Sequence, residues 1–175
     1  MIDYWRSIPG GVCTSNRGYE KSLEYIEFGQ MAHFHASIGI DTTKAANADA
    51  GNYEYTWAYI ILAYVDITLK FAYKFLSKIQ YSWPITVKVI LKVEDFIKIN
   101  YAVPGYRNHF DLDNMSSFSP DKQLLLLNTE IAPAQLIEDE TLMLSVADNL
   151  FWAFGLGWDK PTVSNWLSNT ASQHA

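Results

Sequence analysis

Residues 53–80, YEYTWAYIILAYVDITLKFAYKFLSKIQ, form the longest regular stretch of the chain and decide the predicted fold. Large apolar side chains recur there at helical spacing, which predicts one long amphipathic helix packed on a sheet. The predicted packing stripe comprises Trp57, Ile61, Tyr64, Thr68, Phe71 and Phe75. Four charged residues interrupt the apolar run, and each would cost about 3 kcal/mol near a bilayer centre, so a membrane span is disfavoured.

The pattern after this helix changes to the two-residue period of strands. Pro84 ends the helix, because the residue before a proline prefers extended geometry. ITVKVILKV (85–93) and FIKINYAV (96–103) then alternate apolar and polar residues around Glu94-Asp95. This predicts an antiparallel hairpin with Lys88 and Lys92 on its solvent side.

Further strands are predicted on both sides of this region. Residues 23–28 and 31–38 flank Gly29-Gln30 as a second hairpin. Residues 123–131 contain the run LLLL, which predicts a strand buried on both faces. The polar residues 42–52 are expected to form a surface loop.

A second helix closes the predicted fold. Residues 138–154 carry an apolar stripe, begin with three acidic residues that suit a helix start, and precede Gly155, a natural helix end. The resulting order is β-β-α-β-β-β-α. We therefore expect an α/β protein of the α+β type, in which a mostly antiparallel sheet and two main helices form a two-layer sandwich. Residues 1–167 are expected to form a single domain, and residues 168–175 a disordered tail.

Composition and charge limit the classes of function that the chain can have. The chain has 175 residues with 49% hydrophobic and 15% aromatic content, which predicts a substantial core. Its net charge of −6 opposes the basic footprint of a nucleic-acid-binding protein. Cys13 is the single cysteine, so internal disulfides are excluded, and the N-terminal sequence lacks the apolar core of a signal peptide. We expect a cytoplasmic protein.

The elements and their residues resemble the C-terminal region of bacterial Schlafen AlbA-type DNA-binding and ATP-binding proteins. The turn FGQ (28–30) stands where that region carries an Arg-Asn-Gly-like turn, and no segment resembles the nucleotide-binding half. The resemblance therefore implies an accessory half, and it implies neither ATP nor DNA binding. The matching pieces are YIEFGQMAHFHAS (25–37), YEYTWAYIILAYVDITLKFAYKFL (53–76), WPITVKVILKV (83–93), KQLLLLNTEI (122–131) and FWAFGLGW (151–158).

Two histidines are the candidate metal ligands. His33 and His35 form a His-x-His pair, and on a strand both would lie on one face, a spacing that metal sites use. Glu24 or Glu27 on the partner strand could supply a third ligand. Exposed strand histidines are usually surface polar groups, so we expect no bound metal and no cofactor.

The loop over residues 106–114, YRNHFDLDN, is the candidate active site. It places His109 and Asp111 close together in sequence, as an acid/base pair requires. A calcium loop starting at Asp111 is rejected, because Ser116 replaces the required glycine and position twelve carries no acidic residue. No nucleophile stands in a recognisable frame, so turn formation is the expected role.

Two exposed features remain as candidate contact surfaces. Lys70, Lys74 and Lys78, here called the lysine stripe, recur at four-residue spacing and could gather phosphates, although a solvated face is the expected role. Trp152 and Trp158 are expected to pack in the core, and would mark a contact surface if they do not.

The sequence thus predicts a non-catalytic accessory or protein-interaction module. Its expected partner is a protein, either a nucleotide-binding half of its own or a second copy of the chain. Two alternatives stay open. One is a small enzyme or metal-binding protein that uses His33 and His35 or the loop over residues 106–114. The other is a weak nucleic-acid binder that uses the lysine stripe. An enzyme needs polar groups that converge in a pocket, whereas an interaction module exposes an aromatic patch.

Overall fold

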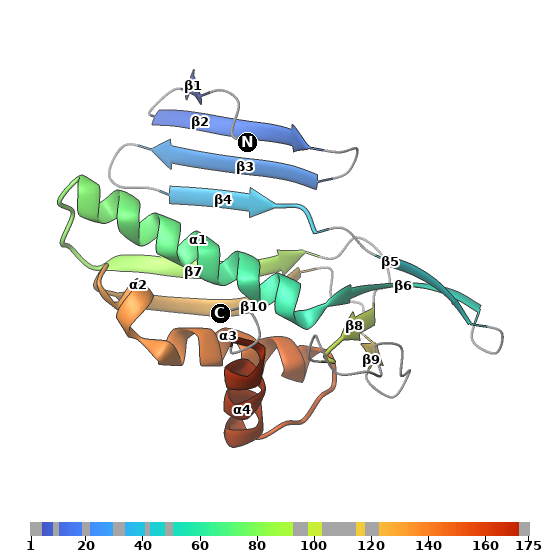
Figure 1. Ribbon diagram of the computed structural model, residues 1–175. Helices are drawn as coiled ribbons and strands as arrows, with labels where there is room; N and C mark the ends of the chain where they lie inside the picture. Colours follow the sequence, from blue (N-terminus) through green and yellow to red (C-terminus); the bar gives the residue numbers. More distant parts are fainter. Residues whose placement is uncertain are drawn as a thin grey trace.

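The computed structural model describes residues 5–8, 11–18, 22–29, 34–40, 43–47, 51–92, 98–102, 115–117 and 123–171 (Figure 1). Strands and helices are both well represented, which confirms the α+β class. Six strands precede the first helix, more than the two predicted. The elements are β1 Trp5–Ile8, β2 Gly11–Gly18, β3 Ser22–Gly29, β4 Phe34–Ile38, β5 Thr43–Asn47, β6 Gly51–Trp57, α1 Ala58–Lys78, β7 Ile85–Lys92, β8 Lys98–Asn100, β9 Met115–Ser117, β10 Gln123–Ile131, α2 Gln135–Glu138, α3 Glu140–Ala153 and α4 Lys160–Ala171.

The described strands form three small sheets. β1, β2, β3 and β4 form a four-stranded antiparallel meander, β10 and β7 form a two-stranded sheet, and β5, β6, β8 and β9 form the third in that order. The pairing of β3 with β4 confirms the hairpin predicted around Gly29-Gln30. Apart from the parallel pair β6 and β8, the described ladders are antiparallel, as predicted.

The predicted hairpin after α1 is wrong in its pairing. β7 pairs with β10, in a register that runs from Ile85 opposite Ile131 to Lys92 opposite Gln123. β8 instead lies between β6 and β9. Glu94-Asp95 supplies no glycine or asparagine for the positive φ angles of a tight hairpin turn, and β10 offers β7 a longer apolar partner face.

The segment before α1 is also extended. Residues 42–52 were expected to form a loop, but β5 and β6 pair as antiparallel strands through this region. The helix predicted from residue 53 begins at Ala58, because Trp57 has the extended angles φ −92° and ψ 132°. Tyr55 is buried, and its ring meets that of Trp57 edge to face at 5.7 Å. Aromatic residues favour strands, which accounts for the change.

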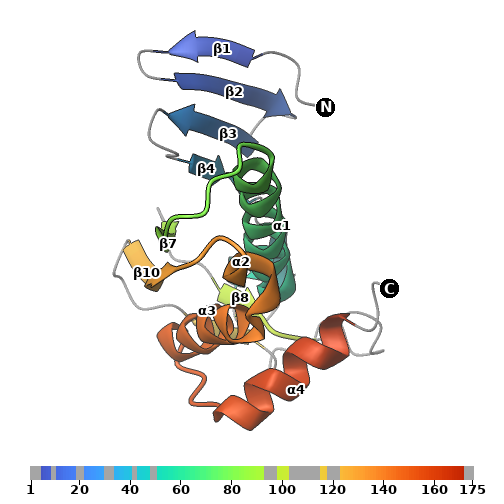
Figure 2. The ribbon, with the colours of Figure 1, turned by 90° about the vertical axis from the view of Figure 1, so that its left-hand side faces the viewer.

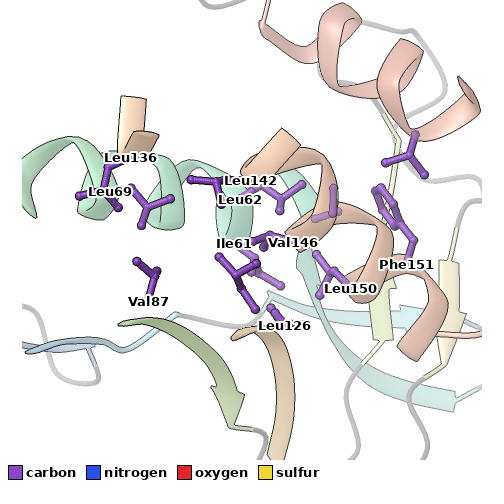
Figure 3. Close-up of a cluster of buried hydrophobic side chains, with 14 of the residues drawn as sticks. Ile61, Leu62, Leu69, Val87, Leu126, Leu136, Leu142, Val146, Leu150 and Phe151 are labelled. Atoms are coloured by element: carbon purple, nitrogen blue, oxygen red, sulfur yellow. The ribbon is translucent and has the colours of Figure 1, made fainter. Parts of the chain in front are cut away.

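Helix α1 buries a face that is rotated from the predicted stripe. Figure 3 shows Ile61, Leu62 and Leu69 of α1 directed toward β7, β10, α2 and α3. Phe71, which was predicted to lie in the core, is half-buried and meets Phe34 of β4 at 6.1 Å. The buried positions of α1 are Ala58, Ile61, Leu62, Leu69, Ala72 and Leu76.

Helix α3 follows the predicted pattern closely. It begins at Glu140, because Asp139 accepts a hydrogen bond from the Thr141 N–H at 2.9 Å and so caps the first turn. Its predicted stripe is buried apart from the half-buried Met143. Gly155 has a positive φ of 77°, as its predicted capping role requires. The preceding residues 135–138 form the separate short helix α2.

Helix α4 was not predicted. Asp159 accepts a hydrogen bond from the Thr162 N–H at 2.9 Å, and Pro161 lies in the first turn, which together start the helix. Val163 and Trp166 are buried. Because α4 continues to Ala171, residues 168–171 of the predicted tail are helical, and residues 172–175 lie outside the described part.

The strand β10 is predicted correctly to the residue, but its burial is not. Leu126 and Leu127 are buried, whereas Leu125 is 52% exposed. A register shift between Leu125 and Leu127 marks a bulge in the ladder with β7. The run LLLL therefore covers this bulge and one buried face. The prediction that the strand is buried on both faces is wrong.

Candidate functional site

Of the candidate metal ligands, His35 alone has a described side chain. His35 is exposed on β4, and His33 lies outside the described residues. Glu27 is the cross-strand partner of His35, whereas Glu24 is the partner of Ile38, three positions further along β4. Among the described side chains, no three His, Cys, Asp or Glu residues are grouped so that they could hold a metal ion.

The candidate active-site loop was predicted over residues 106–114. Residues 106–114, including His109 and Asp111, lie outside the described residues. The acid/base role of these two residues therefore stays a hypothesis from the sequence.

The lysine stripe lies on the exposed side of α1, as predicted. The Nζ atom of Lys70 is 2.7 Å from Oδ2 of Asp66, one helical turn earlier. This pair partly neutralises the stripe, because Asp66 sits beside the cation that a phosphate would contact. Exposed pairs of this kind contribute only a few tenths of a kcal/mol to stability.

A groove of about 250 Å³ follows the same side of α1 and is lined by Ile67, Lys70, Phe71 and Lys74. Ile67 is 60% exposed, and the Phe71 ring reaches Phe34 of β4. The lining combines an apolar floor with two lysine ammonium groups. It contains no carboxylate, imidazole or thiol among the described residues, so it supports binding of an apolar or anionic group and offers no acid/base pair.

The two C-terminal tryptophans differ in burial. Trp158 is half-buried and packs on Phe151 at 4.8 Å and on Tyr101 at 5.2 Å, so it belongs to the core edge as predicted. Trp152, by contrast, is 77% exposed on α3, and Trp83 is 73% exposed between α1 and β7. The prediction that Trp152 packs in the core is wrong, because Phe151 and not its neighbour faces inward.

The pKa of the Asp159 carboxyl departs clearly from its ordinary value, and this carboxyl has a structural role. Hydrogen bonds from the Thr162 hydroxyl and from its backbone N–H lower the pKa of Asp159 below the ordinary value of 3.8. These bonds cap α4. The carboxylate therefore stabilises the start of a helix.

Sequence reasoning missed the pairing of β7 with β10. Lys88 and Lys92 were correctly predicted to face solvent, because the alternation of β7 is clear. Its partner β10 begins more than thirty residues later, and local periodicity does not reveal a pairing over that distance.

Comparison of the chain with protein-family models, with curated proteins and with solved structures found no match. Within the described residues, no helix is long and apolar enough to cross a membrane.

Proposed function

We propose that this chain is a non-catalytic module that acts by binding another protein. The observation that carries the proposal is the exposure of Trp152, an indole held outward on α3 while the adjacent Phe151 is completely buried. A tryptophan side chain buries roughly 150–250 Å² when it is covered. At about 25 cal/mol per Å², covering the exposed part of Trp152 is worth about 3–5 kcal/mol before the costs of association.

The α3 helix supports this indole rigidly. Leu142, Val146 and Leu150 anchor α3 in the core, and the Asn149 side-chain N–H donates to the Leu126 carbonyl of β10 at 2.9 Å. Residue 152 follows Asn149 by three positions, so the two occupy neighbouring places on the helix surface. An aromatic group on a fixed helix loses little conformational entropy on binding, which is typical of interface hot spots.

The resemblance to Schlafen AlbA-type proteins supports a specific kind of partner. It would make the chain an accessory half whose partner is a nucleotide-binding half, encoded separately or in the same protein. A second copy of this chain is the other partner that we consider. Both are protein surfaces, and both would cover Trp152.

Site-specific photo-crosslinking tests the proposal. Trp152 is replaced by benzoylphenylalanine in the full chain, expressed in its native cells, and Asn165, which is exposed on α4, carries the same group as the matched control. We expect a crosslinked product of one defined mass from position 152 and none of that mass from position 165. Mass spectrometry then distinguishes a second copy of this chain from a different protein.

Equal crosslinking at the two positions, or none at position 152, would contradict the proposal. Folding is checked independently, because replacing an exposed side chain should leave the urea midpoint of the protein unchanged. A Trp152→Ser variant should likewise unfold at the wild-type midpoint and lose the partner that crosslinking identifies.

A further inference from the structure

The charged side chains of two fully described segments are divided by sign. Residues 58–92, which form α1 and β7, carry five lysines and Asp66 as their only acid, whereas residues 123–171 carry six carboxylates and Lys160 as their only cation. Glu130 of β10 lies opposite Thr86 of β7, so the division is sharpest between α1 and α3. Two copies of the chain attract one another when the basic part of one meets the acidic part of the other. The six acids are Glu130, Glu138, Asp139, Glu140, Asp148 and Asp159.

The exposed face of α1 offers a groove that combines apolar and cationic groups. The groove of about 250 Å³ is lined by Ile67 and Phe71 and by the two lysines Lys70 and Lys74. A cavity of about 150 Å³ holds a benzene ring, so this groove has room for an indole. Lys70 is paired with Asp66, whereas the Lys74 ammonium makes no hydrogen bond or ion pair with the described residues. Lys74 can therefore receive a carboxylate from a partner.

The exposed face of α3 carries the complementary groups. Trp152 is 77% exposed, and Asp148 lies one helical turn before it, so the two residues are neighbours on the helix surface. Within the described residues, the Asp148 carboxylate makes no hydrogen bond or ion pair. An indole in the α1 groove would cover the exposed part of Ile67 and bring its π face near a lysine ammonium, while the carboxylate pairs with Lys74.

The two faces belong to opposite sides of a shared core. Figure 3 shows buried side chains of α1 and α3 directed into this core, and Ile67 and Trp152 are exposed on the sides of these helices that turn away from it. In Figures 1 and 2, α4 lies on the side of α3 that is remote from α1. Trp152 therefore does not reach the groove of its own copy, and only another copy of the chain can present a groove to it.

We propose that Trp152 of one copy of this chain inserts into the α1 groove of a second copy, with Asp148 of the first copy beside Lys74 of the second. The contact joins unlike surfaces, so each copy can bind a neighbour through either surface, and repetition generates a ring or a filament. Contacts between two α1 faces or two α3 faces would instead bring like charges together. The inference rests on the proposed function and names the partner that covers Trp152.

Sedimentation velocity of the full chain, at concentrations up to about 1 mM, tests this contact. The wild type should form dimers and longer species as its concentration rises. Trp152→Ser and Ile67→Glu should each weaken association at least about thirtyfold, as the loss of an interface hot spot does. Trp83→Ser and Ile137→Glu alter exposed residues outside the two surfaces, and these matched controls should associate like the wild type.

Mixing the two defective variants tests the head-to-tail arrangement. Trp152→Ser keeps its groove and Ile67→Glu keeps its tryptophan, so an equimolar mixture should form dimers that grow no further. Asp148→Lys and Lys74→Glu should each weaken association about fivefold, and a chain that carries both changes should recover it, because the charge pair is then reversed. Urea midpoints equal to that of the wild type show that each variant folds.

A wild-type chain that stays monomeric over this range would overturn the inference. A mixture that does not associate, or a control that weakens association as much as Trp152→Ser, would overturn it too. Benzoylphenylalanine at position 152 separates this failure from failure of the proposed function. A crosslink to residues 67–74 of a second copy supports the inference, whereas a crosslink to a different protein or to α3 of a second copy overturns it and leaves the proposed function intact. The absence of any crosslink contradicts both.

Discussion

The aromatic cluster that joins α3 to α4 yields the sharpest stability prediction. Phe151 is completely buried, and its ring lies 4.8 Å from that of Trp158 and 5.0 Å from that of Trp166. The Trp166 indole N–H donates to the Tyr101 carbonyl at 2.7 Å, which fixes one wall of the cluster. Phe151→Ala should therefore leave a cavity that its neighbours cannot easily fill.

The expected loss follows from these contacts. Truncation of a buried phenylalanine costs about 3–5 kcal/mol, and aromatic pairs add about 0.5–1.5 kcal/mol each beyond area burial. With two such pairs, Phe151→Ala should lie at the upper end, near 4–5 kcal/mol. Phe71→Ala provides the comparison, because its ring is half-buried and meets Phe34 at the longer distance of 6.1 Å. We expect about 1–2 kcal/mol there, since solvent fills part of the vacated space.

Urea unfolding followed by circular dichroism measures both losses. The slopes must agree with the wild type before free energies are compared. If Phe151→Ala does not fold, Phe151→Leu serves in its place and should still cost about 1 kcal/mol or more through the loss of the ring contacts. Equal losses of unfolding free energy for Phe71→Ala and Phe151→Ala would refute this core, because they would mean that α1 buries Phe71, as the sequence alone predicted.

Three further predictions concern single features. Gly155→Ala should lower the free energy of unfolding by about 1–2 kcal/mol in urea melts, because its φ of 77° is unfavourable for a residue with a Cβ; an unchanged midpoint would contradict the cap. The folded-state pKa of Asp159 is lowered, so the stabilisation by its carboxylate is present above the unfolded-state pKa and is lost as the pH falls through the folded-state pKa. Asp159→Asn should therefore flatten the plot of unfolding free energy against pH below about pH 4. An unaltered plot would argue against the helix cap. The lysine stripe should bind duplex DNA with a dissociation constant no lower than about 10⁻⁴ to 10⁻⁶ M at physiological salt. In titrations at two salt concentrations, the logarithm of the binding constant should fall with the logarithm of salt concentration with a slope no steeper than about −3. Submicromolar affinity would contradict this prediction.

Elements with strong local signals could be predicted from the sequence. β10 is correct at both ends, because a run of leucines between turn residues leaves few alternatives, and α3 is close because its cap residues and apolar stripe agree. The start of α1 is wrong by five residues, since Tyr55 and Trp57 fit both a helical stripe and a strand. Helix α4 was missed because its apolar positions are few, although Asp159 and Pro161 carried the start signal.

Long-range pairing accounts for what the sequence could not show about the candidate sites. The alternation of β7 correctly places Lys88 and Lys92 on the solvent side, but any apolar strand could have covered its edges. The pairing of β7 with β10 is instead favoured by side chains from α1 and α3 that pack on the same face. The same limit applies to Trp152. Helical spacing cannot separate it from Phe151 until the direction of the core is known, and that direction is set by β10 and α4 together. A surface that recognises a partner therefore consists of side chains that the rest of the chain does not cover. Which side chains these are depends on the whole fold and not on any one segment.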